Sequence, residues 1–159
     1  MTGWRNEMNI LCSKLTSEAV SIALPASSKE EVIHLLSEKI SDLNHLECAE
    51  LIESEVLRRE QMVPTCLGFD CSIPHAHIDI LNDTYIVAAN LSHSISFSGT
   101  TEGDTTLVFM IIGPERHAPL HLRLLSTIAR LLHDDYIRSE LKHCTDPAQF
   151  VETLCTKAR

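Results

Sequence analysis

One segment constrains the fold of this chain more than any other. Residues 106–112, Thr-Leu-Val-Phe-Met-Ile-Ile, form a continuous apolar run that ends at Gly113 and Pro114. The run lacks the alternation of apolar and polar residues that marks a strand with one face in water. It therefore predicts a central strand that is covered on both faces. It is also far shorter than the roughly 20 apolar residues that a membrane-spanning helix needs.

Helical patterns flank this strand on both sides. Ser27 and Glu30 fit a capping box, and Asp146 followed by Pro147 fits an N-cap with proline at the first helical position. The apolar patterns predict helices at about 28–43, 46–59, 119–133, 134–143 and 146–157, and further strands at 85–89 and 94–98. Helices that flank a small central sheet indicate a fold of the α/β sandwich class.

Length and charge limit the domain count and the partners. At about 150 residues per domain, a chain of 159 residues predicts one domain spanning residues 1–159. The 22 acidic residues outnumber the 13 basic ones, for a net charge of −9. This balance argues against nucleic acid and anionic membranes as partners, because both need basic patches. Residues 1–14 carry Glu7 and few apolar residues, so they do not form a signal peptide. We expect a cytoplasmic protein that does not insert into membranes.

The spacing of the six cysteines gives no metal or redox motif. No pair is spaced Cys-x-x-Cys, which excludes the usual zinc and thioredoxin patterns. The residues concerned are Cys12, Cys48, Cys66, Cys71, Cys144 and Cys155. In a cytosolic protein we expect reduced thiols, several of them buried as small apolar side chains. The even number leaves disulfide pairing open.

His75 is the first candidate for chemistry. It directly follows Pro74, and proline fixes its own φ and restricts the residue before it. The backbone that presents His75 is therefore stiff, which suits a nucleophile that must keep one orientation. A loop histidine without a task is the alternative. His77 lies two residues on, but no third ligand is identifiable, so we expect no metal site.

His121 is the second candidate. It shares an apolar helical stripe with Leu124, Leu125 and Ile128, which would suit a core histidine. With Pro119 at the first helical position, however, His121 lies in the first turn. Helix N-termini attract phosphate and disfavour the imidazolium ion, which keeps the ring neutral.

Arg59 is the third candidate. It falls near the inward face of its predicted helix, whereas Arg58 points away. An inward arginine needs an anionic partner, either a carboxylate in the same protein or a bound anion.

Three ordered motifs give the sequence a resemblance to a known family. They are Arg59-Glu60 at a helix end, Ser-Ile-Pro-His at 72–75, and His-Leu-Arg-Leu-Leu at 121–125. Together with a strand and helix start at 22–31, they cover about residues 15–154. The chain resembles the type-2 EIIA domain of the bacterial phosphoenolpyruvate-dependent phosphotransferase system, the fructose/mannitol group. Its size is closest to the nitrogen-regulatory EIIA branch, whose domain is free-standing.

The resemblance implies a fold, roles and partners. The family fold is a single-domain α/β sandwich with a mixed central sheet. His75 would accept a phosphoryl group from an HPr-type protein, His121 would donate a hydrogen bond to that group, and Arg59 would orient the site. No cofactor is implied. The group would pass to a permease component, or its presence would control binding to a regulated target protein.

The segment before His75 departs from the family pattern. Family glycines are replaced by Cys66 and Asp70, and a family serine by Pro64. We expect Thr65, Gly68 and Asp70 of this segment to contribute to binding. A carboxylate at position 70 would repel an incoming phosphoryl group unless it points outward.

Four functions follow from these patterns. The first is a phosphocarrier with a regulatory output, and the second is a binding module on the same fold that has lost transfer because of the altered loop 63–71. The third is a sugar-specific EIIA that serves a separate permease. A metal-dependent hydrolase is a distant fourth.

Overall fold

A mixed β-sheet forms the centre of the protein. The computed structural model describes residues 2–98 and 104–157. The strands are β1 (Val20–Leu24), β2 (Cys66–Gly68), β3 (Cys71–Ser72), β4 (His75–His77), β5 (Tyr85–Ser96) and β6 (Asp104–Gly113). Their order is β1-β5-β6-β3-β2, and β4 also pairs with β6. The β1–β5 pair and the pairs of β6 with β3 and β4 are parallel, whereas β5–β6 and β2–β3 are antiparallel.

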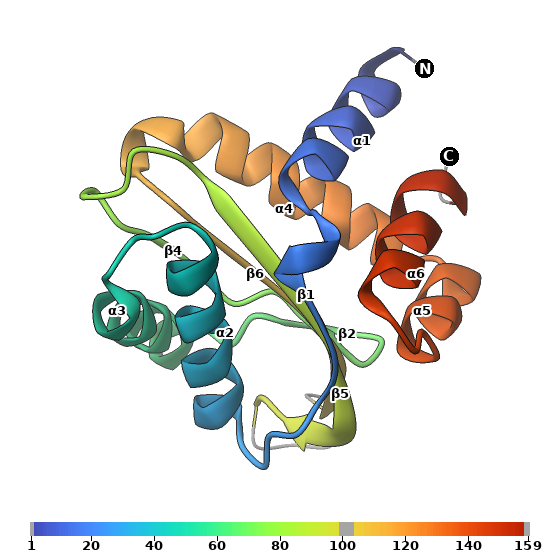
Figure 1. Ribbon diagram of the computed structural model, residues 1–159, viewed down its shortest axis with the longest axis horizontal. Coiled ribbons are helices and arrows are strands. Elements are labelled where there is room, and N and C mark those ends of the chain that lie inside the picture. Colours follow the sequence, from blue (N-terminus) through green and yellow to red (C-terminus); the bar gives the residue numbers. More distant parts are fainter. Residues whose placement is uncertain (1, 99–103, 158–159) are drawn as a thin grey trace.

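Helices cover both faces of the sheet. The α-helices are α1 (Thr2–Lys14), α2 (Lys29–Leu43), α3 (Ala49–Met62), α4 (Ala118–Leu132), α5 (Asp135–Lys142) and α6 (Pro147–Glu152). Short turns complete the chain: 3₁₀ helices η1 (Ser17–Ala19) and η3 (Glu115–His117), and the π-helix η4 (Thr153–Lys157). Figure 1 shows α2 and α3 on one side of β5 and β6, with α4, α5 and α6 on the other side. This arrangement is the predicted α/β sandwich.

The predicted central strand is confirmed. β6 lies between β5 and the β3–β4 segment, and its residues 107–112 have no exposed surface. The predicted strands at 85–89 and 94–98 are largely one strand, β5, whose pairing with β6 shifts register between Asn90 and Ile95.

The predicted helix at about 28–43 is confirmed as α2, but its capping box lies one residue later than predicted. The predicted start of the next helix is wrong by about three residues. The N-cap of α2 is Ser28 rather than Ser27, because the Ser28 hydroxyl accepts from the Glu31 N–H and the Glu31 carboxylate returns to the N–H of Ser27. α3 begins at Ala49 rather than near 46, because His45 and Glu47 both have positive φ, which a right-handed helix excludes.

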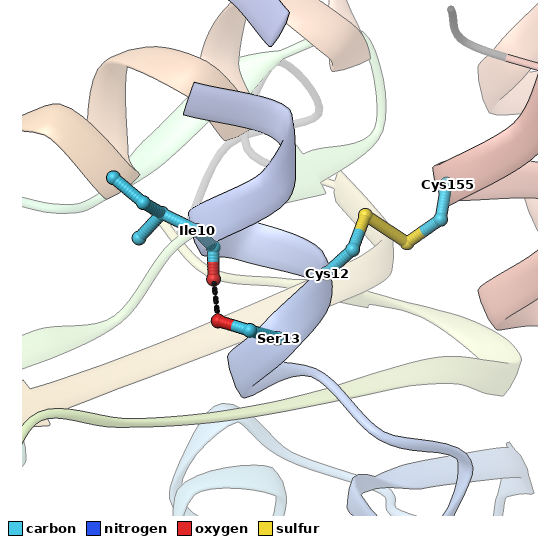
Figure 2. Close-up of a disulfide and its surroundings, with 4 residues drawn as sticks. All are labelled: Ile10, Cys12, Ser13 and Cys155. Atoms are coloured by element: carbon cyan, nitrogen blue, oxygen red, sulfur yellow. Dashed lines mark hydrogen bonds between the residues drawn. A yellow bond between two sulfur atoms is a disulfide. The ribbon is translucent and has the colours of Figure 1, made fainter. Parts of the chain in front are cut away.

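The cysteines also differ from the expectation of reduced thiols. Figure 2 shows a disulfide between Cys12 in α1 and Cys155 in η4, with a Cα–Cα distance of 5.9 Å. It joins the two ends of the described chain. Among the described residues, the other four cysteines are free thiols. No helix in residues 2–98 and 104–157 is long and apolar enough to cross a membrane.

Candidate active site

The backbone that leads to His75 is held by hydrogen bonds and by pairing with the central strand. The N–H of Ile73 donates to the Thr65 carbonyl at 3.1 Å, and the Pro74 carbonyl accepts from the N–H of Ile111 at 3.1 Å. His75 itself begins β4 and pairs with Ile111 of β6. His75 is therefore a strand residue, so the stiffness that Pro74 predicts is reinforced by hydrogen bonds to the central strand.

A hydrogen bond fixes which ring nitrogen of His75 carries the lone pair. Its Nδ1 lies 2.7 Å from the carbonyl oxygen of Ile73. A carbonyl only accepts hydrogen bonds, so Nδ1 carries the proton and the lone pair of the neutral ring lies on Nε2. Burial, together with the positive charge of Arg59, lowers the pKa of His75 below its ordinary value. The ring is thus neutral near pH 7, with an unprotonated nitrogen at Nε2.

His121 lies beside His75 with unused hydrogen-bonding capacity. It is the fourth residue of α4 and is 2% exposed, and its ring centroid is 5.4 Å from that of His75. Among the described residues, neither of its ring nitrogens has a hydrogen-bond partner. A neutral imidazole has one N–H to donate. Buried polar groups are normally paired, so this N–H is suited to a group that binds between the two histidines.

We expect the acid sensitivity of the fold to depend on His121. Burial and the nearby His77 and His75 lower its pKa from 6.5 to about 3. Between these pH values the unfolded chain binds a proton at residue 121 and the folded protein does not. The free energy of unfolding therefore falls as the pH falls from about 6.5 towards 3. Between pH 7 and pH 4, the free energy of unfolding should fall by on the order of 3 kcal/mol less in His121→Leu than in the wild type. Urea unfolding at both pH values measures this, and an equal loss in both proteins would contradict it.

Arg59 shares a pocket with His75. The pocket has a volume of about 340 Å³. Its walls come from α3, from the segment that leads to His75, and from α4. The lining residues are Arg59, Pro64, Thr65, Cys66, Leu67, Ile73, His75, Leu125, Ser126 and Ala129. Arg59 is half-buried, and its Nη1 donates to the Val63 carbonyl at 3.0 Å. Within the part of the chain that the structure describes, no carboxylate forms an ion pair with Arg59, whereas Arg58 pairs with Glu55 on the surface. The remaining N–H groups of Arg59 are available to an anion in the pocket.

Glu60 positions the segment that leads to His75. It is 2% exposed, and its carboxylate accepts hydrogen bonds from the backbone N–H and the hydroxyl of Thr65. Burial raises the pKa of Glu60, and the Thr65 hydroxyl and the charges of Lys29 and Arg59 oppose that rise. In the sequence, Glu60 is noted only as part of the Arg59-Glu60 motif. Its hydrogen bonds to Thr65 are found only in the folded structure, where the segment after α3 brings Thr65 to the carboxylate.

We expect Glu60→Ala to lower the free energy of unfolding by about 3 kcal/mol. The substitution leaves the N–H and hydroxyl of Thr65 buried without a partner. Glu55→Ala on the same helix is the matched control, since it removes only a surface ion pair with Arg58 and should cost less than about 1 kcal/mol. Equal losses in urea unfolding would show that Glu60 has no special role.

The turn before His75 explains how the missing family glycines are tolerated. Gly68, Phe69 and Asp70 have φ values of +76°, +54° and +62°, so the β2–β3 turn is left-handed. Asparagine and aspartate tolerate this conformation better than most residues. Cys66 lies in β2 and is not among the described residues with positive φ, so its position does not demand glycine.

The carboxylate of Asp70 is directed away from the pocket. It forms an ion pair with Lys142 of α5 at 2.5 Å, and the neighbouring Phe69 ring lies under the guanidinium group of Arg138. Of the three residues expected to contribute to binding, Thr65 lines the pocket with His75, while Gly68 and Asp70 form the turn. The repulsion anticipated from Asp70 is thus reduced by its pairing with α5.

Comparison with known proteins gives the family. Residues 13–157 match the family described as "Phosphoenolpyruvate-dependent sugar phosphotransferase system, EIIA 2". A nitrogen regulatory protein of Bradyrhizobium diazoefficiens is 31% identical over 86% of this chain and 89% of its own length. The 2-O-alpha-mannosyl-D-glycerate-specific EIIABC component of Escherichia coli is 27% identical over 97% of this chain, which spans 24% of that protein.

A solved structure confirms the fold. The nitrogen regulatory protein IIA-Ntr from Neisseria meningitidis superposes with a TM-score of 0.82 at 18% identity, covering 91% of this chain and 99% of the other. The mixed sheet between two helical layers is therefore an architecture that solved proteins share with this chain.

Proposed function

Because the chain belongs to the type-2 EIIA family of the phosphoenolpyruvate-dependent sugar phosphotransferase system, we propose that it carries a phosphoryl group on Nε2 of His75. One observation supports this most directly. The hydrogen bond from Nδ1 to the Ile73 carbonyl leaves the lone pair on Nε2, in a neutral ring beside the unpartnered His121. The family supports the reaction class, and this geometry supports Nε2 as the accepting atom.

The proposed step is a direct transfer between two histidines. The Nε2 lone pair of His75 attacks the phosphorus of a phosphohistidine on the donor protein. A new P–N bond forms as the donor P–N bond breaks, and the bonding pair returns to the donor nitrogen. Such transfers have little covalent chemistry for the protein to perform, so positioning and charge stabilisation supply the catalysis.

Three groups of this chain would stabilise the product. His75 keeps its Nδ1 proton, so its ring becomes cationic when Nε2 is phosphorylated, and the Ile73 carbonyl that accepts from Nδ1 favours that charge. The N–H of His121 and the guanidinium group of Arg59 are suited to the phosphoryl oxygens. In this arrangement His75 would carry the phosphoryl group, and His121 and Arg59 would contact its oxygens.

An HPr-type phosphocarrier is the proposed donor. Exposed apolar side chains are near neighbours of the site residues in the sequence. Met62 and Val63 follow Arg59 at the end of α3, and Leu122 follows His121 on α4. The net charge of −9 would steer a donor that presents basic residues around its own histidine. We propose that residues 1–159 act in this exchange as a single domain.

A regulatory output is the proposed use of the phosphoryl group. The Bradyrhizobium relative that aligns over most of both chains is named a nitrogen regulatory protein. Binding to a target protein would then depend on the phosphorylation state of His75. The second candidate is onward transfer to a sugar permease, which the name of the Escherichia coli EIIABC relative supports. It predicts that the phosphate moves to a cysteine or histidine of a permease fragment.

Phosphorylation of the purified chain tests the proposal. We expect incubation with phosphoenolpyruvate, Enzyme I and HPr to give stoichiometric phosphate that is lost in acid, as expected for a P–N bond. An absence of label, in a mixture where an active EIIA is labelled, would contradict the carrier function. It would favour a binding module that no longer transfers phosphate, whose affinity for a target should be indifferent to His75→Ala.

A further inference from the structure

The structure places a third histidine, His77, in contact with His121. His77 lies two residues after His75 in β4, and residues two apart in a strand point to the same face. Its ring centroid is 4.4 Å from that of His121, with 43° between the ring planes, so it is closer to His121 than the His75 ring is. On its other side, Nδ1 of His77 lies 3.7 Å from Oε2 of Glu115 in η3.

We propose that His77 is a positioning residue of the phosphoryl site, whose ring packs against His121 and holds that imidazole in the orientation that reaches a group on His75. The proposal rests on the proposed function for the reaction itself. His77 is not expected to touch the phosphoryl group, and it acts through His121.

His121 needs such support because hydrogen bonds do not orient it. Histidines that act on a ligand through one nitrogen are usually fixed by a hydrogen bond to the other. Among residues 2–98 and 104–157, neither nitrogen of His121 has a partner. The described ring contacts of His121 are those with His75 and His77. If the His77 ring were removed, the His121 ring could turn, and its N–H would no longer be directed at one place.

The charges around His121 are consistent with this role. His75 and His77 face it from β4, and Glu115 on η3 faces His77. Arg59 on α3 lines the pocket that His75 also lines. After burial, His77 is the largest cause of the lowered pKa of His121. On the side of His77 away from His121 lies the Glu115 carboxylate, and 36% of the His77 side chain is exposed. His77 thus shields one side of His121 from water.

Transfer kinetics test the positioning role. The rate of phosphoryl transfer from phosphorylated HPr is measured against HPr concentration for the wild type, His77→Ala, His77→Phe and His93→Ala, an exposed control on β5. We expect His77→Ala to lower the limiting rate about ten- to hundredfold, with little change in the half-saturating concentration. His77→Phe should recover most of the rate because it restores a ring, and His93→Ala should have no effect. A wild-type rate in His77→Ala, or equal loss in His77→Phe, overturns the proposal.

Nuclear magnetic resonance of the histidine rings gives an independent readout. In the wild type we expect the ring signals of His121 to stay unchanged between pH 8 and pH 5. In His77→Ala they should titrate within this range, because burial is the largest cause of the lowered pKa of His121 and loss of the His77 ring opens that ring to water. Unchanged His121 signals in His77→Ala would overturn the proposal. The experiment needs no phosphoryl donor, so it separates a failure of the His77 role from a failure of the proposed carrier function.

Discussion

His75→Ala is expected to abolish phosphorylation of the chain by HPr. The substitution removes Nε2 of His75, the attacking atom of the proposed step, whose lone pair is set by the hydrogen bond from Nδ1 to the Ile73 carbonyl. Loss of the attacking group should lower the rate by at least about a thousandfold. The measurement is the acid-labile phosphate per chain after incubation with phosphoenolpyruvate, Enzyme I and HPr.

Two comparisons make the His75→Ala result specific. His93→Ala changes an exposed histidine of β5 and should be labelled like the wild type. His121→Leu keeps the nucleophile but loses the N–H beside it, so it should be labelled slowly, with a rate about a hundredfold or more below the wild type. Retained labelling of folded His75→Ala would show that another residue accepts the phosphoryl group, and the assignment to His75 would then be wrong.

Reduction of the Cys12–Cys155 disulfide is expected to lower the free energy of unfolding by about 4–5 kcal/mol. The bond joins residues separated by 143 positions, so it restricts nearly the whole unfolded chain. Loop-closure entropy makes a bond across so long a loop strongly stabilising. Urea unfolding with and without dithiothreitol measures the effect.

Cysteine variants provide the matched tests of this bond. Cys12→Ser, Cys155→Ser and the double variant should all lose a similar amount, because each breaks the same bond. Cys48→Ser is the control, since Cys48 is a free and half-buried thiol. If the double variant loses the sum of two large single effects, or if dithiothreitol has no effect on the wild type, the two cysteines are not joined in solution.

Local patterns in the sequence predicted much of the fold. The apolar run at 106–112 identified the buried strand β6, because a strand covered on both faces needs apolar residues at every position. The helices after it followed from apolar spacing and from caps such as Asp146, whose carboxylate accepts from the N–H of Gln149. The motif residues Arg59 and His75 line one pocket, and His121 lies beside His75.

Other elements were not predicted because they depend on pairing partners far along the chain. β2, β3 and β4 have only two or three residues each, too few for a period to be recognised, and they exist through pairing with one another or with β6. α1 was also missed, and its position is fixed by packing on α4. The ion pair between Glu7 and Arg123 at 2.8 Å and the stacking of Arg130 on Trp4 join these two helices.

The sequence by itself determined the class of the fold, the buried strand and the three residues proposed for the chemistry, because periodicity, caps and motifs are local properties of the chain. Only the tertiary structure decided which groups meet. It paired Cys12 with Cys155, turned Asp70 towards Lys142, and placed His77 against His121. Each of these contacts joins residues far apart in sequence, and their closeness follows from how helices and strands pack, which no local pattern encodes.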